Sequence, residues 1–251
     1  MNEKIQVIDA HAHIGQSSLS TSNNTGEYLI EMMDKNGVDA SIVLPHANQD
    51  LQSVHAIHDE IYEASQKWPG RIVGMASINP RLGKEVYRQE LRRCVQEMGF
   101  VGIKLEPVIY ASKIDSAIAR VVFECAQEFD VPVMIHTGVG TFSNPFFAVP
   151  VANEYPNLTI ILAHTGLVTY VEEALLAAKL CPNIMLELSW TLITGAWRAI
   201  KDIGYERVLF GSDLAENIPV EITKINSIPG LTDIEREHVM GLNAKRIYNL
   251  D

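Results

Sequence analysis

Short apolar runs rich in valine, isoleucine and leucine alternate along this chain with longer segments whose apolar residues recur at helical spacing. This alternation is typical of βαβ units around a parallel sheet. The runs predict eight strands, at 6–10, 40–44, 72–78, 101–105, 133–136, 159–163, 184–188 and 208–211. The helical segments predict crossover helices at 27–35, 53–67, 84–97, 117–128, 149–154, 170–178 and 196–203, then a closing helix at 233–242 and a short helical tail, NAKRIYNL. Eight strands alternating with helices close a (β/α)8 TIM barrel, and 251 residues fit one such domain over 1–251.

Composition narrows the functional class further. Hydrophobic residues make up 47% of the chain and charged residues 20%, which is typical of a globular protein with a large core. No apolar run approaches the roughly 18 to 20 residues of a membrane span. The net charge of −11 opposes binding to nucleic acid, and the three scattered cysteines indicate reduced core residues in a cytoplasmic protein. A small-molecule substrate is the expected partner, and a homo-oligomer stays open.

One polar stretch, QSSLSTSNNTG at 16–26, follows the first predicted strand. On a barrel, the loop after a strand lies on the catalytic face. Both a lid over the site and a merely solvated loop fit this segment.

Several polar side chains come where predicted strands end. His11 and His13 alternate along an extended segment, which points both imidazoles the same way. His136 and His164 each follow an apolar run and precede Thr-Gly, and Asp213 follows the last strand. Because the carboxyl ends of all barrel strands meet at one mouth, we expect these five side chains to converge there.

The motifs that carry these residues resemble the amidohydrolase superfamily, specifically its amidohydrolase-2 branch, which is related to aminocarboxymuconate-semialdehyde decarboxylase. They are IDAHAHIG, VGIKLEP, MIHTG, LAHTG, FGSD and NAKRIYNL, in this order along essentially the whole chain. The resemblance implies that His11, His13, His136 and Asp213 hold one divalent ion, with His164 beside the metal-bound water or the substrate. Imidazole and carboxylate ligands with one open position suit zinc. Asp213 is then both a ligand and, with His164, a catalytic group that handles protons.

The fourth predicted strand leaves two readings open. Lys104 and Glu106 alternate with apolar neighbours, and many relatives have KLHP here, with a histidine in the place of Glu106. The departure leaves room for a second metal, held by Glu106 or by a carboxylated Lys104 with His164. The other reading is a structural pair between Lys104 and Glu106.

Other candidates follow from their positions near strand ends or on helices. His46 and Trp190 follow strands and are candidates for the pocket lining, Arg81 is a candidate carboxylate binder, and Asp9 is expected to organise the first strand or support the site. The histidines at 55 and 58 lie in a helical pattern, which predicts surface positions.

The constellation predicts a metal-dependent hydrolase that attacks a small ester, lactone or amide with a metal-activated water. The alternative is nonoxidative decarboxylation of an unsaturated or aromatic acid. Hydrolysis is favoured because a substrate carboxylate needs a cation, and only Lys104 and Arg81 are expected near the mouth. A noncatalytic sensor is disfavoured by the complete ligand set. A metal-dependent nuclease is favoured by Glu106 but opposed by the net charge.

Overall fold

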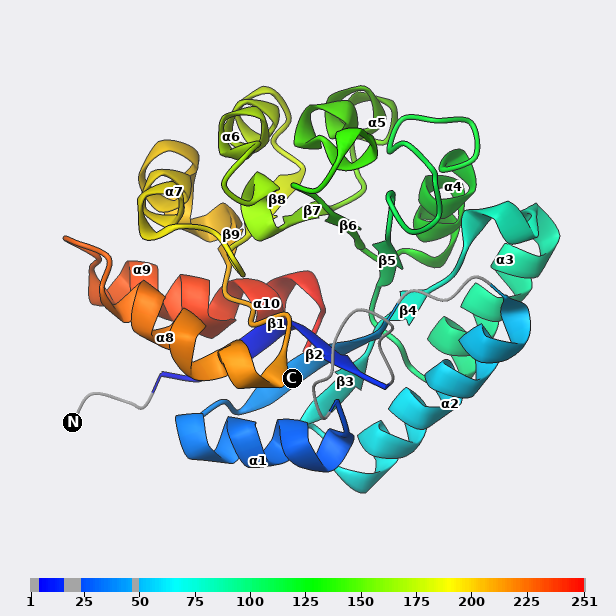
Figure 1. Cartoon of the computed structure of the whole chain (residues 1–251), viewed down its shortest axis with the longest axis horizontal. Helices are drawn as coiled ribbons and strands as arrows, with labels where there is room; N and C mark the ends of the chain where they lie inside the picture. The colour runs from blue at the N-terminus through cyan, green and yellow to red at the C-terminus, as the bar shows by residue number, and fades with distance from the viewer. Residues whose placement is uncertain (1–4, 16–23, 47–49, 251) are drawn as a thin grey trace.

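The computed structural model describes residues 5–15, 24–46 and 50–250, and within these ranges the chain forms a barrel of parallel strands wrapped by helices (Figure 1). The strands are β1 (Ile8–Ile14), β2 (Ala40–Pro45), β3 (Ile72–Gly74), β4 (Ala76–Ser77), β5 (Ile103–Leu105), β6 (Val133–His136), β7 (Ile160–Ala163), β8 (Ile184–Glu187) and β9 (Val208–Leu209). The α-helices are α1 (Gly26–Asn36), α2 (Leu51–Lys67), α3 (Lys84–Arg92), α4 (Arg120–Phe129), α5 (Ala148–Glu154), α6 (Val171–Leu180), α7 (Ile193–Arg198), α8 (Ile218–Asn226), α9 (Asp233–Glu237) and α10 (Asn243–Ile247).

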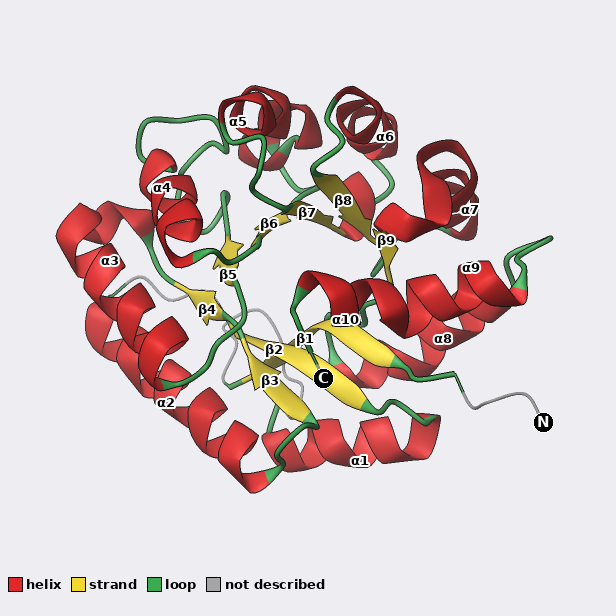
Figure 2. Ribbon diagram, turned by 180° about the vertical axis from the view of Figure 1, so that it is seen from behind, coloured by secondary structure: helices red, strands yellow, loops and turns green. Residues whose placement is uncertain are grey.

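Two seams join the ladders into one ring. The strands pair in parallel as β1-β2-β3 and as β4 through β9 in chain order. Between β3 and β4, Met75 donates its backbone N–H to the carbonyl of Val43 at 2.9 Å, so these two segments are halves of the one strand predicted at 72–78. At the other seam, Ala10 donates to Phe210 at 3.0 Å and Ala12 pairs with Asp213. The predicted (β/α)8 architecture is confirmed, and Figure 2 shows the same ring from behind.

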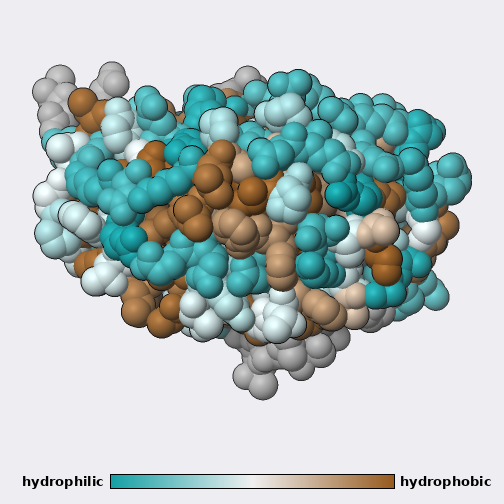
Figure 3. Space-filling model, turned by 90° about the horizontal axis from the view of Figure 1, so that it is seen from above, coloured by the Kyte–Doolittle hydropathy of each residue, from teal (hydrophilic) through white to brown (hydrophobic). Residues whose placement is uncertain are grey.

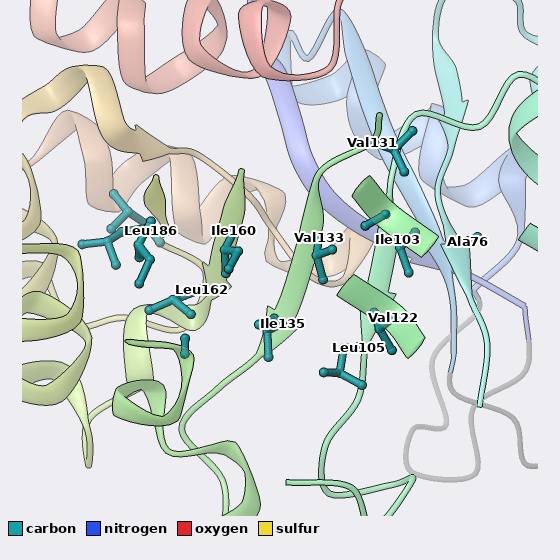
Figure 4. Packing of buried hydrophobic residues seen from close by; sticks show 14 of the residues in the cluster. Ala76, Ile103, Leu105, Val122, Val131, Val133, Ile135, Ile160, Leu162 and Leu186 are labelled. Atoms are coloured by element: carbon teal, nitrogen blue, oxygen red, sulfur yellow. The ribbon is translucent and has the colours of Figure 1, made fainter. Parts of the chain in front are cut away.

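Alternation along the strands sorts the buried side chains into two layers. In β6, Val133 and Ile135 belong to the large core between strands and helices, where Val122 of α4 packs (Figure 4). Met134 between them belongs to the smaller cluster inside the barrel, together with Ile161 of β7. The period of two that a strand imposes therefore separates the helix-facing core from the barrel interior.

A β-bulge in β1 decides which of its residues face the barrel interior. The register with β2 shifts between Asp9 and Ala12, which adds one residue to β1. Before the shift, Ile8 belongs to the interior cluster, and after it Ala12 belongs to the helix-facing core. The extra residue turns His11 toward the site. Its backbone N–H donates to the Asp9 carboxylate at 3.1 Å.

The expected elements differ from the observed ones in a few places. Strand β1 runs to Ile14, beyond the predicted end at residue 10, and helix α8 was not predicted. The predicted helix at 196–203 begins earlier, as α7, and continues as a π-helical turn over Ala199–Gly204. Residues 16–23 lie outside the described ranges, so the lid stays a prediction. The expected core positions of the three cysteines, Cys94, Cys125 and Cys181, are confirmed, because all three are buried and free.

The predicted surface position of His58 is wrong. His58 is fully buried between α2 and α3, where its Nδ1 lies 2.7 Å from Glu90 Oε1 and its Nε2 accepts from Ser77 N–H at 3.1 Å. Cys94 lies 3.3 Å from the same Nδ1, so the three side chains resemble a metal site. However, the bond from Ser77 uses the lone pair of Nε2 and leaves the proton on Nδ1, which is then a donor to Glu90 rather than a ligand. The group is a hydrogen-bonded structural cluster.

The face seen from above in Figure 3 carries a hydrophobic band between hydrophilic areas. Leu176 and Leu180 of α6 are among the exposed large apolar residues. In the described part of the chain, no helix is both long and apolar enough to span a membrane.

Candidate metal centre

Three acceptor atoms from opposite ends of the chain meet at the carboxyl ends of the strands. Nε2 of His11 lies 3.1 Å from Nε2 of His13, and Oδ1 of Asp213 lies 3.2 Å from the first and 3.3 Å from the second. Both histidines belong to the bulged strand β1. The backbone N–H of Asp213 donates to the carbonyl of His11, which holds the Asp213 carboxylate beside them. The structure therefore brings together the first-strand pair and the last-strand aspartate.

In both imidazoles, the hydrogen-bond partner of Nδ1 shows which ring nitrogen carries the proton. Nδ1 of His13 lies 3.2 Å from the carbonyl oxygen of Pro45, and Nδ1 of His11 lies 3.0 Å from a carboxylate oxygen of Glu187. Both partners are acceptors, so each Nδ1 carries the proton and each Nε2 presents a lone pair. Two lone pairs and a carboxylate oxygen thus face one another, an arrangement that a cation between them would stabilise.

This donor set fits one divalent ion. Ligands about 2.1 Å from a common ion, at angles between octahedral and tetrahedral, are about 3.0 to 3.4 Å apart, and the three observed separations lie in this range. Imidazole and carboxylate are ligands that transition metals bind in proteins. His11, His13 and Asp213 are therefore suited to hold the ion.

The two histidines from the middle strands lie beside this group. Nε2 of His164 lies 3.1 Å from Nδ1 of His136, which is 3.7 Å from Glu106. His164, His11 and Asp213 offer ligand atoms that all lie within 4.8 Å of one another. The five predicted side chains converge as expected, and His136 joins the group through His164.

Lys104 and Glu106 both point into the barrel. They are buried, and Nζ of Lys104 lies 3.5 Å from Glu106 and 2.9 Å from Nε2 of His11. Lys104 and Glu106 thus form an ion pair. Because Lys104 also contacts the candidate ligand His11, this pair belongs to the same polar network as the candidate metal ligands. Glu106, His136 and His164 together form a second polar group next to the first.

Burial and neighbouring charges set the protonation states. Burial, with Lys104 beside it, holds the pKa of His11 well below its usual range, and burial does the same for His164. Burial alone would raise the pKa of Asp213, but His11 and His13 outweigh it and hold that pKa well below the usual range. Neutral imidazoles and an ionised carboxylate are the forms that bind metals.

Trp190 and Asp213 share an uncommon backbone conformation at the mouth. Their φ angles are +60° and +66°, in the left-handed region that bulky residues rarely adopt. The conformation brings the indole Nε1 to 2.7 Å from Oδ2 of Asp213. Such backbone strain clusters at functional sites, and here it places the ring of Trp190 against a candidate ligand.

His46 and Arg81, two further candidates from the sequence, make different kinds of contact. His46 stacks on His13 with ring centroids 4.6 Å apart, and burial, followed by the electrostatic influence of the neighbouring His13, lowers the pKa of His46 to about 3. The guanidinium of Arg81 donates to the backbone carbonyls of Tyr110 and Ala111, and its role as a carboxylate binder stays a prediction.

Buried polar residues outside the predicted set support the site. Glu187 and Ser189 lie behind His11 and His164. Asp9 accepts the hydroxyl of Ser212 at 2.6 Å and the backbone N–H of His11 at 3.1 Å, so it ties the first strand to the segment after β9. A signal for Glu187 was present in the sequence, since a carboxylate inside an apolar parallel strand must have partners.

Comparison with known proteins identifies relatives of this chain. A family model described as amidohydrolase matches residues 8–250. The 2-amino-3-carboxymuconate-6-semialdehyde decarboxylase of Dictyostelium discoideum is 25% identical over 245 residues, which cover 80% of this chain and 67% of that protein. The gamma-resorcylate decarboxylase of a Rhizobium species is 22% identical and covers 88% of this chain and 86% of the relative.

A solved structure shows the same fold. A dihydroxybenzoic acid decarboxylase from Polaromonas, crystallised with manganese and the inhibitor 2-nitroresorcinol, superposes with a TM-score of 0.78 over 98% of both chains at 19% identity.

These relatives overturn the hydrolase predicted from the sequence, because they are decarboxylases. The prediction rested on a shortage of cations for a substrate carboxylate. Arg81 is indeed engaged elsewhere. However, a divalent ion held by His11, His13 and Asp213 would itself bring two positive charges to the mouth, so the shortage of cationic side chains does not exclude a carboxylate substrate.

Proposed function

Because this chain belongs to the amidohydrolase family, we propose that it is a metal-dependent decarboxylase that releases carbon dioxide from an unsaturated or aromatic carboxylic acid without oxidation. The observation that carries the proposal is the triangle of His11, His13 and Asp213 with His164 beside it. Relatives that share the family act as decarboxylases on acids of this kind.

His11, His13 and Asp213 would hold the ion, with His136 as the expected fourth ligand. The bound ion would supply positive charge that attracts an anionic substrate and stabilises negative charge developing during the reaction. Zinc suits these ligands, whereas the similar structure from Polaromonas contains manganese. We propose one divalent ion and leave the choice of metal to analysis of the purified protein.

The residues around the ion must handle one proton. In a nonoxidative decarboxylation the bond between the substrate carbon and its carboxylate breaks, carbon dioxide leaves, and a proton is added to that carbon. His164 presents Nε2 next to the candidate ligands. Because burial holds its pKa well below the usual range, an imidazolium formed there would be a strong acid. We assign proton transfer to His164, with Asp213 as the second proton-handling group.

The rim of the mouth favours a planar apolar substrate. Exposed apolar side chains lie on the loops that follow the middle and late strands, where a barrel builds its binding site. They are Val139 and Phe142 after β6, Val168 after β7, and Trp190 and Leu192 after β8. Aromatic and aliphatic walls with few polar groups are typical of small-molecule sites.

The test is a panel of substituted benzoic acids and unsaturated dicarboxylic acids, each incubated with metal-loaded protein while carbon dioxide release is followed. We expect release from at least one acid, and none from protein stripped of metal by a chelator. Esters, lactones and amides in parallel incubations measure hydrolysis. Hydrolysis without any release of carbon dioxide would overturn the proposal.

A further inference from the structure

We propose that one buried carboxylate, that of Glu187, sets the tautomers of both His11 and His164, acting directly on the first and through the hydroxyl of Ser189 on the second. Glu187 is thus a positioning residue that aims two Nε2 lone pairs at the mouth. The catalytic consequence rests on the function proposed above, but the hydrogen-bond relay itself does not depend on it.

The surroundings of Glu187 identify it as an acceptor. It is fully buried, and Oε2 receives the backbone N–H of His164 at 3.1 Å and the hydroxyl of Ser189 at 2.9 Å. Oε1 receives the backbone N–H of Ser189 at 2.5 Å. Both carboxylate oxygens therefore act as acceptors, and each already receives at least one hydrogen bond. Nδ1 of His11, 3.0 Å from Oε2, therefore donates the fourth hydrogen bond.

The hydroxyl of Ser189 fixes the tautomer of His164 in the same way. A serine hydroxyl has one proton, and this proton is directed at Glu187. Nδ1 of His164 lies 2.8 Å from the same oxygen, so it must donate to a lone pair of Ser189. Nε2 of His164 is left unprotonated, 3.1 Å from His136. Without the relay, the neutral imidazole of His164 would be free to carry its proton on either nitrogen.

The neighbouring strand is shaped to admit this carboxylate. A Cβ atom on Gly211 would lie 2.4 Å from Oε1 of Glu187 and 3.0 Å from Cβ of His11. The glycine of the FGSD motif therefore gives Glu187 the space to reach His11. The relay joins β1, the end of β7 and β8, and the segment after β9 leaves the space that it needs.

The first experiment reads the tautomers directly, by nitrogen-15 NMR of the imidazoles in metal-free protein. We expect His11 and His164 in the wild type to carry the proton on Nδ1. Ser189→Ala should shift His164 toward the Nε2–H form and leave His11 unchanged. Glu187→Gln should move the signals of both, since one amide oxygen replaces an acceptor that serves four donors. The matched control is Ser41→Ala, another fully buried serine, whose hydroxyl has no hydrogen-bond partner among the described residues.

The outcome that overturns the relay is a His164 that carries its proton on Nε2 in the wild type, or that keeps its Nδ1 proton in Ser189→Ala. Because this measurement uses neither metal nor substrate, it can fail while carbon dioxide release is observed, and it can succeed while that release is absent.

Metal affinity provides a second readout that separates the two branches. Loss of the carboxylate partner of a ligating histidine typically weakens metal binding about 10- to 100-fold. We expect this loss in Glu187→Gln, measured by competition with a chromophoric chelator, and little change in Ser189→Ala. Wild-type affinity in a folded Glu187→Gln protein would refute the direct branch to His11.

Discussion

The indole of Trp190 donates to Oδ2 of Asp213 at 2.7 Å, while Oδ1 of the same carboxylate faces His11 and His13. The two oxygens of Asp213 therefore have separate partners. The indole fixes the rotation of the carboxylate and leaves one oxygen facing the two imidazoles.

Trp190→Phe should lower the rate of carbon dioxide release about 10- to 100-fold, because a hydrogen bond to a charged group contributes about 1.5 to 3 kcal/mol. Metal content should change little, since Oδ1 and both imidazoles remain. Steady-state kinetics with metal analysis of the same sample checks this. Trp197→Phe on α7, where the ring is similarly exposed, is the matched control and should keep the wild-type rate.

His164→Asn should reduce turnover by at least about 100-fold while most of the metal stays bound, because we assign this residue to proton transfer, whose typical contribution is 10²- to 10⁴-fold. His136→Ala should lose both metal and activity, because we assign His136 to the ligand set. Elemental analysis beside activity assays distinguishes the two roles. Equal metal loss in both variants would make His164 a ligand instead.

Protein purified without chelator should contain about one divalent ion per chain, and removing the ion should abolish activity. Adding back zinc or manganese in separate samples identifies the metal that restores it. A stoichiometry near two would show that Glu106, His136 and His164 hold a second ion, and Glu106→Gln should then bring the content back to one. Full activity after complete metal removal would contradict the mechanism.

The structural cluster at Glu90 predicts a loss of stability in acid. Burial disfavours the charge of Glu90, but hydrogen bonds from His58 and Arg93 outweigh it and lower the pKa to about 2, from 4.5. The stabilisation is complete above pH 4.5 and is lost as the pH falls from 4.5 toward 2. Glu90→Gln should destabilise the protein by about 3 kcal/mol at neutral pH, since it leaves buried partners unpaired.

The check is urea unfolding of both proteins at several pH values between 3 and 7. The free energy of unfolding of Glu90→Gln should decline less steeply in acid than that of the wild type. Glu85→Gln, an exposed glutamate on the same helix, is the control and should follow the wild type. Parallel pH profiles for Glu90→Gln and the wild type would contradict this assignment.

The barrel could be predicted because its strands are buried on both faces and therefore form continuous apolar runs. The same property made the strand ends visible, since His136, His164 and Asp213 each follow such a run. The bulge in β1 could not be predicted, because it adds one residue without changing composition. Helix α8 was missed because isoleucine, valine and threonine, which favour strands, are frequent in IPVEITKIN.

The error in the placement of His58 has a specific physical cause. His58 lies four residues after Val54 and three before Ile61, which places it on the buried stripe of α2, but a titratable side chain was expected to face solvent. The partners that hold His58 there, Glu90 and Ser77, come from distant parts of the chain.

The reaction class could not be decided from the residues, because one metal and a few proton-handling groups support several chemistries. Glu187 was missed for a related reason. Its role depends on Ser189, His11 and His164 meeting around it, and this becomes visible only when three strands are placed side by side.

The contact between Gly211 and Glu187 limits the order in which these two positions can mutate during evolution. Any side chain at 211 would collide with the carboxylate, so a mutation there is tolerated only after position 187 has accepted a shorter residue. A shorter residue at 187 first removes the acceptor of His11. Each single step therefore passes through a weakened intermediate, and we expect the two positions to change together or not at all among functional descendants.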